Sequence, residues 1–145
     1  MAVSANIYGN GMLKILTGAV DLDTDSFKVM LTTSAYTPDQ DAHTFRSDVT
    51  NEVTGTGYSA GGLALGGLTC TYDAASNEAR WDFNDPSWLG ATFTARRMVV
   101  YKSRGGAASA DELVFWVDFG IDESVTQGTF TYIVPATGAL AVTVA

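Results

Sequence analysis

Few side chains in this 145-residue sequence could carry out acid–base or nucleophilic chemistry. It contains one histidine, His43, one cysteine, Cys70, and three lysines. A zinc site built from pairs of histidines or cysteines is therefore excluded. We expect Cys70 to be a small buried hydrophobic residue, because it shares a strand face with Leu68 and Tyr72. We expect His43, which lies in an Asp-rich loop, to be solvated or hydrogen-bonded.

A serine motif at residues 57–61 matches the G-x-S-x-G nucleophile elbow literally. The elbow requires a strand, a turn and a helix, and its histidine follows the serine in the chain. Here no helix pattern follows Ser59, and His43 precedes it. The overlapping residues 55–60 match G-x-G-x-x-G/A, but no βαβ unit surrounds them. We interpret both matches as a Gly-rich turn that needs positive φ angles.

Asp21, Asp23 and Asp25 match the opening of a calcium-binding loop. The sixth and twelfth positions of that loop would be Ser26 and Thr32 in place of Gly and Glu, so an EF-hand is excluded. An ordinary solvated acidic turn is the simpler interpretation, and a looser surface calcium site is the alternative. Carboxylates are frequent, yet nothing selects a pair for glycoside hydrolysis. The sequence therefore predicts no catalytic, cofactor-binding or metal-ligating residue, and a protein that is not an enzyme.

Half of the basic residues lie within nine positions, at Arg96, Arg97, Lys102 and Arg104. Consecutive residues of a strand point to opposite faces, so Arg96 and Arg97 should not form one patch. One interpretation is local salt bridging. The other is docking on an acidic surface of a partner, where charge complementarity fixes the register.

Trp116 should lie on the outer face of its strand, next to Val114 on the same face. Either the other sheet, a loop or the N-terminal helix covers it, or it contacts a partner, since Trp is enriched at interface hot spots. Together with the four basic residues above, Trp116 completes the candidate partner interface.

Composition restricts the partners further. Sixteen acidic and eight basic residues give a net charge of −8, which disfavours binding to the phosphate backbone of nucleic acid. No stretch approaches the roughly 18 uninterrupted apolar residues that span a bilayer, so we expect no membrane association. The first residues lack a basic region followed by an apolar one, so we expect no secretory signal and folding in the cytoplasm.

The elements that must position these residues follow from the hydrophobic pattern. Residues 1–10 are small and polar and suggest an N-terminal arm, and apolar spacing predicts a short helix over about 10–18. Alternation over 27–32 predicts a strand. Residues 35–62 are irregular, with a possible short helix near 44–50, and a loop this long is where we expect binding.

From residue 63 the pattern is typical of β-structure to the end of the chain. We expect a mainly β fold: one domain over 1–145, built as an antiparallel β-sandwich or jelly-roll-like barrel with a short N-terminal helix. The expected strands cover 68–72, 79–83, 93–102, 113–119, 130–134 and 140–144.

Several stretches of the sequence resemble a family of small virion structural proteins of tailed bacteriophages. The resemblance runs from Phe27 to the C-terminus. It is carried by the runs FKVMLTTS (27–34) with YTP (36–38), NEVTGTGYSAGG (51–62), TYDAA (71–75), TAR (94–96), VYK (100–102) and VDFG (117–120).

The resemblance implies a non-enzymatic capsid decoration, or cement, protein. Such proteins are small, β-rich and oligomeric, and bind the outer surface of the head shell. The implied partners are the major capsid protein and further copies of this chain, as a dimer or trimer, and the implied location is the virion surface after synthesis in the host cytoplasm. A tail, neck or fibre-base protein is the alternative. A carbohydrate-binding module would need a row of exposed aromatic residues, for which Trp81, Trp88 and Trp116 are the candidates, although Trp81 is expected in the core.

Overall fold

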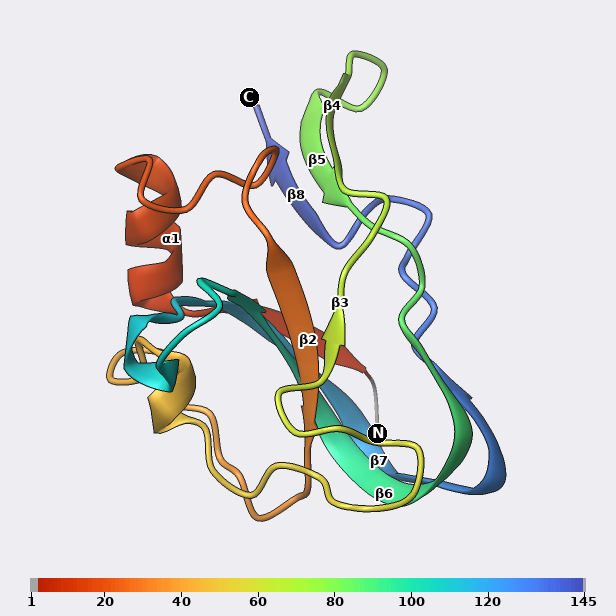
Figure 1. Ribbon diagram of the computed structural model, residues 1–145. Helices are drawn as coiled ribbons and strands as arrows, with labels where there is room; N and C mark the ends of the chain where they lie inside the picture. The colour runs from red at the N-terminus through yellow and green to blue at the C-terminus, as the bar shows by residue number, and fades with distance from the viewer. Residues whose placement is uncertain (1–2, 145) are drawn as a thin grey trace.

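Three strands form the centre of the larger sheet in the computed structural model, which describes residues 3–144 (Figure 1). They are β2 (Phe27–Thr32), β6 (Ser87–Lys102) and β7 (Leu113–Thr131). The short strands β1 (Ser4–Ile7) and β3 (Leu63–Ala64) close the two edges, giving the antiparallel order β1-β7-β6-β2-β3. The alternating strand expected over 27–32 is confirmed.

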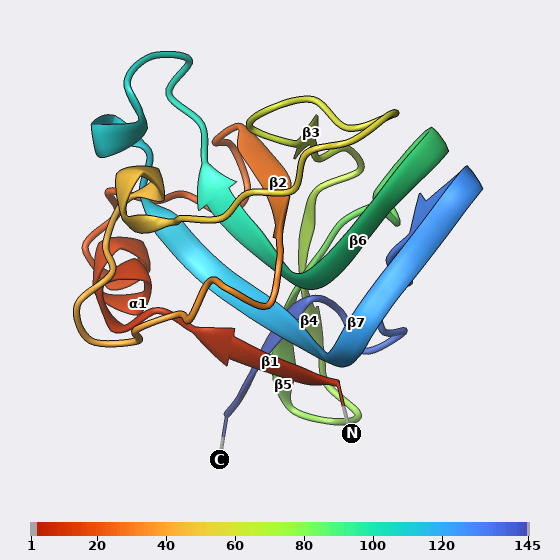
Figure 2. The ribbon, with the colours of Figure 1, turned by 90° about the horizontal axis from the view of Figure 1, so that it is seen from below.

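The two long strands bend together, as Figure 2 shows. Ala95 pairs with Glu123 and Arg97 pairs with Asp118, so β7 uses five residues where β6 uses two. The extra residues form a bulge in which Gly120 has a φ of 82°. The prediction of separate strands over 113–119 and 130–134 is wrong, because the bulge turns the chain without ending the pairing.

A second, three-stranded sheet projects from one end of the larger one (Figure 1). Its order is β4 (Thr69–Asp73), β5 (Glu78–Asp82) and β8 (Leu140–Thr143), all antiparallel. The expected hairpin around residues 73–77 is confirmed. The register pairs Tyr72 with Ala79 and Ala79 with Val142, so these three residues share one face of the small sheet.

The first ten residues are not a free arm. Apart from residues 1–2, which lie outside the described residues, they form β1 along β7 and then enter helix α1 (Gly9–Leu16). Pairing with β7 and burial of the Tyr8 ring, which is fully buried, hold this segment in place. The small residues of β1 carry too weak a hydrophobic pattern to indicate a strand. The expected helix exists, shifted slightly toward the N-terminus.

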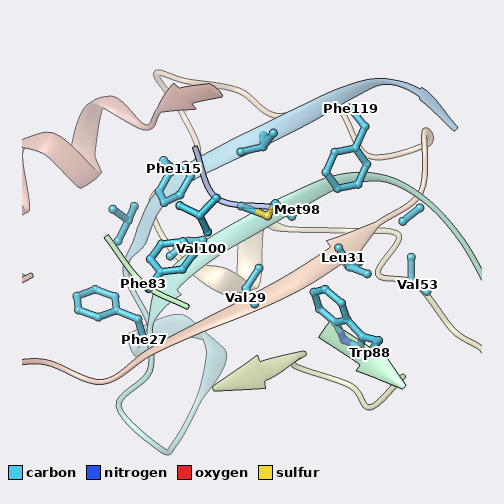
Figure 3. Packing of buried hydrophobic residues seen from close by; sticks show 14 of the residues in the cluster. Phe27, Val29, Leu31, Val53, Phe83, Trp88, Met98, Val100, Phe115 and Phe119 are labelled. Carbon is cyan, nitrogen blue, oxygen red and sulfur yellow. The ribbon is translucent and has the colours of Figure 1, made fainter. Parts of the chain in front are cut away.

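Buried side chains lie on both faces of the larger sheet. The main core lies between the two sheets; there Phe83, just after β5, packs against Phe115 of β7 with ring centroids 6.4 Å apart (Figure 3). A second cluster lies on the opposite face and contains Tyr8, Met30, Tyr36, Val99, Tyr101, Leu113 and Trp116.

The irregular segment 35–62 contributes to covering that second face. It supplies Tyr36 and Val49 to the cluster, and its expected short helix is a single 3-10 turn, η1 (Arg46–Asp48). A second such turn, η2 (Ala108–Ala110), precedes β7. The expectation of a mainly β fold with antiparallel sheets and one short helix is confirmed, and the sheets have a sandwich-like arrangement. The jelly-roll strand order stays a prediction.

Candidate interaction surface

The Gly-rich segment around Ser59 is a structural turn in this fold. Gly57 and Gly62 have φ angles of 78° and 77°, and a Cβ on Gly62 would overlap the Val29 carbonyl oxygen. Ser59 is exposed, and among the described residues no hydrogen bond joins it to a histidine or a carboxylate. The segment is bound to the sheet by Tyr58, whose hydroxyl accepts the Leu31 N–H at 2.9 Å.

His43 ends a hydrogen-bond chain that begins at the buried Tyr8 hydroxyl. The Tyr8 hydroxyl donates to the Tyr36 hydroxyl at 2.9 Å, and Tyr36 donates to His43 Nδ1 at 3.0 Å. The Asp39 N–H also points to Nδ1, which fixes this nitrogen as the acceptor. Burial, and then donation to Tyr36, raise the pKa of Tyr8 far above its ordinary value. The expectation of a hydrogen-bonded histidine is confirmed.

Cys70 does not lie in the core. It is exposed on β4, so the expectation of a buried cysteine is wrong. The face that it shares with Tyr72 is apolar in sequence, but the larger sheet does not extend far enough to cover it. Partial burial, and then the negative charges of Asp23 and Asp21, raise the pKa of the thiol. A raised pKa reduces the thiolate population, which makes Cys70 a poor nucleophile.

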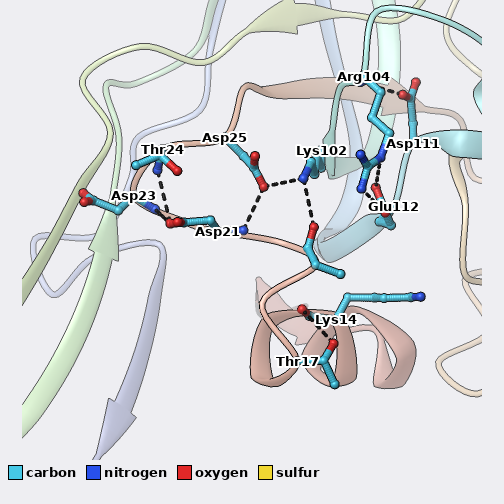
Figure 4. Close-up of polar contacts among 11 residues, drawn as sticks. Lys14, Thr17, Asp21, Asp23, Thr24, Asp25, Lys102, Arg104, Asp111 and Glu112 are labelled. Atoms are coloured by element: carbon cyan, nitrogen blue, oxygen red, sulfur yellow. Dashed lines mark hydrogen bonds and ion pairs between the residues drawn. The ribbon is translucent and has the colours of Figure 1, made fainter.

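The Asp-rich turn uses its carboxylates within the chain (Figure 4). Asp21 Oδ1 accepts the Asp23 N–H at 2.9 Å, and Asp25 Oδ2 accepts the Asp21 N–H at 2.8 Å. The bond from the Asp23 N–H, and then those from Thr24, lower the pKa of the Asp21 carboxyl group. Within residues 3–144, no group of three His, Cys, Asp or Glu side chains is placed to hold a metal ion.

Lys102 and Arg104 are both engaged inside the molecule (Figure 4). Lys102 Nζ lies 2.6 Å from Asp25 Oδ2 and donates to the Ala19 carbonyl at 2.9 Å. Arg104 forms a bidentate ion pair with Glu112, in which Nη2 lies 2.7 Å from Oε1 and Nε lies 3.0 Å from Oε2. Their role in a partner interface stays a prediction. A partner that binds them would have to compete with these internal ion pairs.

Arg96 and Arg97 reach the same carboxylate, so the expectation that they point to opposite faces is wrong. Each Nε lies 2.9 Å from one oxygen of Asp118. The register shift between Ala95 and Arg97 breaks the strict alternation that the expectation assumed. Partial burial acts to raise the pKa of Asp118, but bonds from Arg96 and Gly120 and the charges of both arginines outweigh it and lower the pKa.

Trp116 is only 9% exposed and packs against Tyr8, with ring centroids 4.6 Å apart. The outer face of its strand is thus covered, which agrees with the first of the two interpretations of this residue. Trp81 and Trp88 are also buried. A carbohydrate-binding platform built from the tryptophans is therefore absent.

An apolar groove with a volume of about 410 Å³ lies between the small sheet and the N-terminal segment. Its walls come from β1, α1, the turn at Leu22, β4, β5 and β8. The lining residues are Ala5, Asn6, Ile7, Met12, Ile15, Leu16, Leu22, Cys70, Thr71, Ala79, Arg80, Trp81, Leu140, Ala141 and Val142. We call the hollow lined by these residues the apolar groove.

Exposed apolar side chains border the groove. Leu16 is 77% exposed on α1, and Val142 is 56% exposed on β8. On the same sheet face as Val142, Tyr72 is 58% exposed. Arg80 is the one charged lining residue, and Asp73 and Glu78 neutralise it at 2.9 and 2.8 Å. The groove therefore offers apolar contact area with no acid–base pair.

Two strand edges also flank the groove. β1 ends one sheet and β8 ends the other, so each has an edge with no neighbour among the described strands. Both strands line the groove. On the β1 edge, the Ile7 carbonyl accepts a hydrogen bond from the Gln40 side chain at 3.1 Å. Unpaired strand edges are sites where another chain can add its own strand.

Sequence reasoning missed this groove. It assigned the face with Cys70 and Tyr72 to the core on the basis of alternation, and alternation does not reveal how far the opposing sheet extends. The available signal was the short helix, in which four of the eight residues are large and apolar.

The chain matches no protein-family model, no curated protein and no solved structure. Within residues 3–144, no helix has the length and apolar character needed to cross a membrane.

Proposed function

We propose that this protein is a non-enzymatic structural component of a tailed-bacteriophage virion that decorates the head. It binds the outer surface of the major capsid protein shell, through the apolar groove, and stabilises the head. The sequence resemblance motivates the class, and the groove supplies a contact surface suited to it.

The observation that carries the proposal is the chemistry of the groove. Its lining is almost entirely uncharged, and its borders include aliphatic side chains more than half exposed. Contiguous exposed apolar surface is typical of protein contact sites. Ser59 and His43, the residues that would suggest hydrolysis, line no part of it. Binding to another protein accounts for this arrangement better than catalysis does.

The occupant that fits the groove is an extended apolar segment of the shell protein. The free edges of β1 and β8 provide backbone donors and acceptors, while the groove floor accepts side chains of alternating residues. A polar or charged segment would lose its hydration against an uncharged floor. A second copy of this chain is the competing occupant, and a tail, neck or fibre-base location is the competing position in the virion.

Val142→Asp tests the proposal. The change places a carboxylate at the border of the groove, where Val142 is exposed and its replacement leaves the core untouched. We expect binding to purified heads that lack the protein to weaken by at least about tenfold, because burying an unpaired charge in an apolar contact is costly. Co-sedimentation with heads over a concentration series measures the affinity.

Thr143→Asp is the matched control, because Thr143 is exposed on the opposite face of the same strand. It should bind heads as the unchanged protein does, and both variants should keep the melting temperature. Equal binding of the Val142 variant would contradict docking through the groove. A loss of self-association in the Val142 variant, with head binding intact, would assign the groove to a second copy instead.

A further inference from the structure

A second hollow of different character lies beside the loop that connects β6 to β7. It has a volume of about 220 Å³, and its walls come from β2, the 35–62 segment, the end of β6 and the loop after it. The lining residues are Lys28, Arg46, Ala60, Gly61, Tyr101, Ser103, Gly105, Gly106 and Asp111. Two cations and one carboxylate give this lining a net positive charge, in a chain of net charge −8.

Lys28 is the unusual member of this lining. Six of the eight basic residues form ion pairs within the chain, and among the described residues Lys28 and Lys14 form none. Lys28 is half-buried on β2, opposite Tyr101 of β6. A partly desolvated ammonium without a counter-charge attracts an anion more strongly than one in open water does.

Arg46 brings a second cationic group to the same space. Its Nε is bonded to Asp111 Oδ2 at 2.8 Å, and its guanidinium lies 5.2 Å from the centroid of the Tyr101 ring. These contacts fix the guanidinium, while among the described residues its two terminal nitrogens form no hydrogen bond. Two parallel N–H groups of this kind match the two oxygens of a carboxylate.

Gly61 leaves the space between the two cations open. A Cβ at this position would lie 3.5 Å from Lys28 Nζ and 4.0 Å from Arg46 Nη1, so any side chain would fill the hollow. The carboxylates nearest to the hollow already accept hydrogen bonds from other groups of the chain. Asp111 is bonded to Arg46, and Glu52, which does not line the hollow, accepts the Gly61 N–H at 2.6 Å and the Tyr58 hydroxyl at 2.7 Å.

We infer that this hollow is a socket for one carboxylate side chain of a protein partner. Lys28 and Arg46 bind the carboxylate, and Gly61, Gly105 and Gly106 allow it to approach the backbone. The inference rests on the proposed function for the identity of the partner, in which an aspartate or glutamate on the shell surface enters the socket. A nucleic acid is disfavoured, because the net negative charge of the chain repels a polyanion and the hollow is small.

A small peptide tests the socket without any virion component. The probe is acetyl-Gly-Glu-Gly-amide, whose only charge is the glutamate carboxylate, and acetyl-Gly-Gln-Gly-amide is its uncharged counterpart. In two-dimensional amide NMR we expect saturable shifts of the Gly61, Gly105 and Gly106 signals with the glutamate peptide only. Lys28→Gln should weaken this binding about fivefold, whereas Lys14→Gln, which removes the other lysine without an ion pair, should not change it.

The socket is refuted if the glutamine peptide produces the same shifts, if Lys14→Gln weakens binding as much as Lys28→Gln, or if the three glycine signals stay fixed. A short single-stranded DNA that shifts these signals more strongly than the peptide would also overturn it in favour of a phosphate site.

Binding to heads separates this inference from the proposed function. Weaker binding of Lys28→Gln to heads, with Lys14→Gln unchanged, supports both. Head binding that is insensitive to Lys28→Gln removes the socket from the interface and leaves the proposed function standing. If the glutamate peptide binds but the unchanged protein does not bind heads, the socket is supported and the shell is not its partner.

Discussion

Asp118 is the residue on which the bend of the long hairpin depends. Its two oxygens lie 2.9 Å from the Nε atoms of Arg96 and Arg97, and one of them also accepts the Gly120 N–H at 2.8 Å. Gly120 belongs to the bulge that turns β7, so one carboxylate pairs with two arginines and also accepts a hydrogen bond from the bulge. The charged side chains that suggested docking in sequence thus have a structural role.

Replacing Asp118 by Asn should therefore destabilise the fold. We expect the free energy of unfolding at pH 7 to fall by about 1–3 kcal/mol, because the partly buried Arg97 loses its counter-charge and Arg96 keeps only the more distant Asp122. The native state lowers the pKa of Asp118 below its ordinary 3.8, so its contribution is complete above that value and is lost as the pH falls further. Urea unfolding at pH 7 and near pH 3 should show the difference between the two proteins shrinking at the lower pH.

Asp122→Asn is the control for this measurement. Asp122 is half-exposed and lies 3.6 Å from Arg96 Nη1, so its loss should have a clearly smaller effect. An equal effect of the two substitutions, or a difference that does not change with pH, would contradict the role assigned to Asp118.

At the scale of elements, the loop segment 51–62 is anchored to the larger sheet at several points. Tyr58 is bonded to the Leu31 N–H, the Tyr101 hydroxyl donates to the Gly61 carbonyl at 2.6 Å, and Gly62 lies against the Val29 carbonyl. The stretches 27–34, 51–62 and 100–102 thus lie against one another. The residue types of these stretches are explained by this packing without any catalytic role for Ser59.

Gly62→Ala should test this anchoring. Gly62 and Gly105 have nearly equal positive φ angles, 77° and 75°, but a Cβ at Gly62 overlaps β2 whereas one at Gly105 meets nothing within 4 Å. We expect Gly105→Ala to cost about 1 kcal/mol for the backbone conformation alone, and Gly62→Ala about 2–4 kcal/mol, since the clash adds to that strain. Chemical unfolding of both variants measures the costs. Equal costs would mean that the loop moves away from β2 freely.

The sequence was informative where one pattern determined one element. The strand at 27–32, the hairpin around 73–77 and the short helix follow directly from hydrophobic spacing and turn residues. It was less informative where the outcome depended on distant segments. The bulge at Gly120 joins two expected strands into one, and pairing with β7 turns the expected N-terminal arm into β1.

The candidate interface shows the same limit. Trp116 lies on the face away from the main core, as expected, but Val114, expected on that same face, packs in the main core. The cover of Trp116 comes from Tyr8 and Tyr36, far away in sequence. The four basic residues were recognised as a cluster, while their carboxylate partners could not be selected among sixteen acidic residues. The apolar groove was not predicted, because it exists only where the small sheet extends beyond its cover.

For the molecule as a whole, the proposed function requires two surfaces with different chemistry. The apolar groove provides contact area and free strand edges, and the socket at Lys28 and Arg46 provides a charged point of attachment that fixes orientation. The remaining acidic surface disfavours non-specific association with nucleic acid.

The copy number of this chain in purified virions tests the central claim most directly. Quantitative mass spectrometry against the major capsid protein gives the ratio of the two chains. We predict a ratio near one to one, or a simple fraction of it, because a decoration protein follows the shell lattice. A ratio of a few per hundred would contradict head decoration and favour the tail, neck or fibre base, and absence from the particle would contradict every virion role.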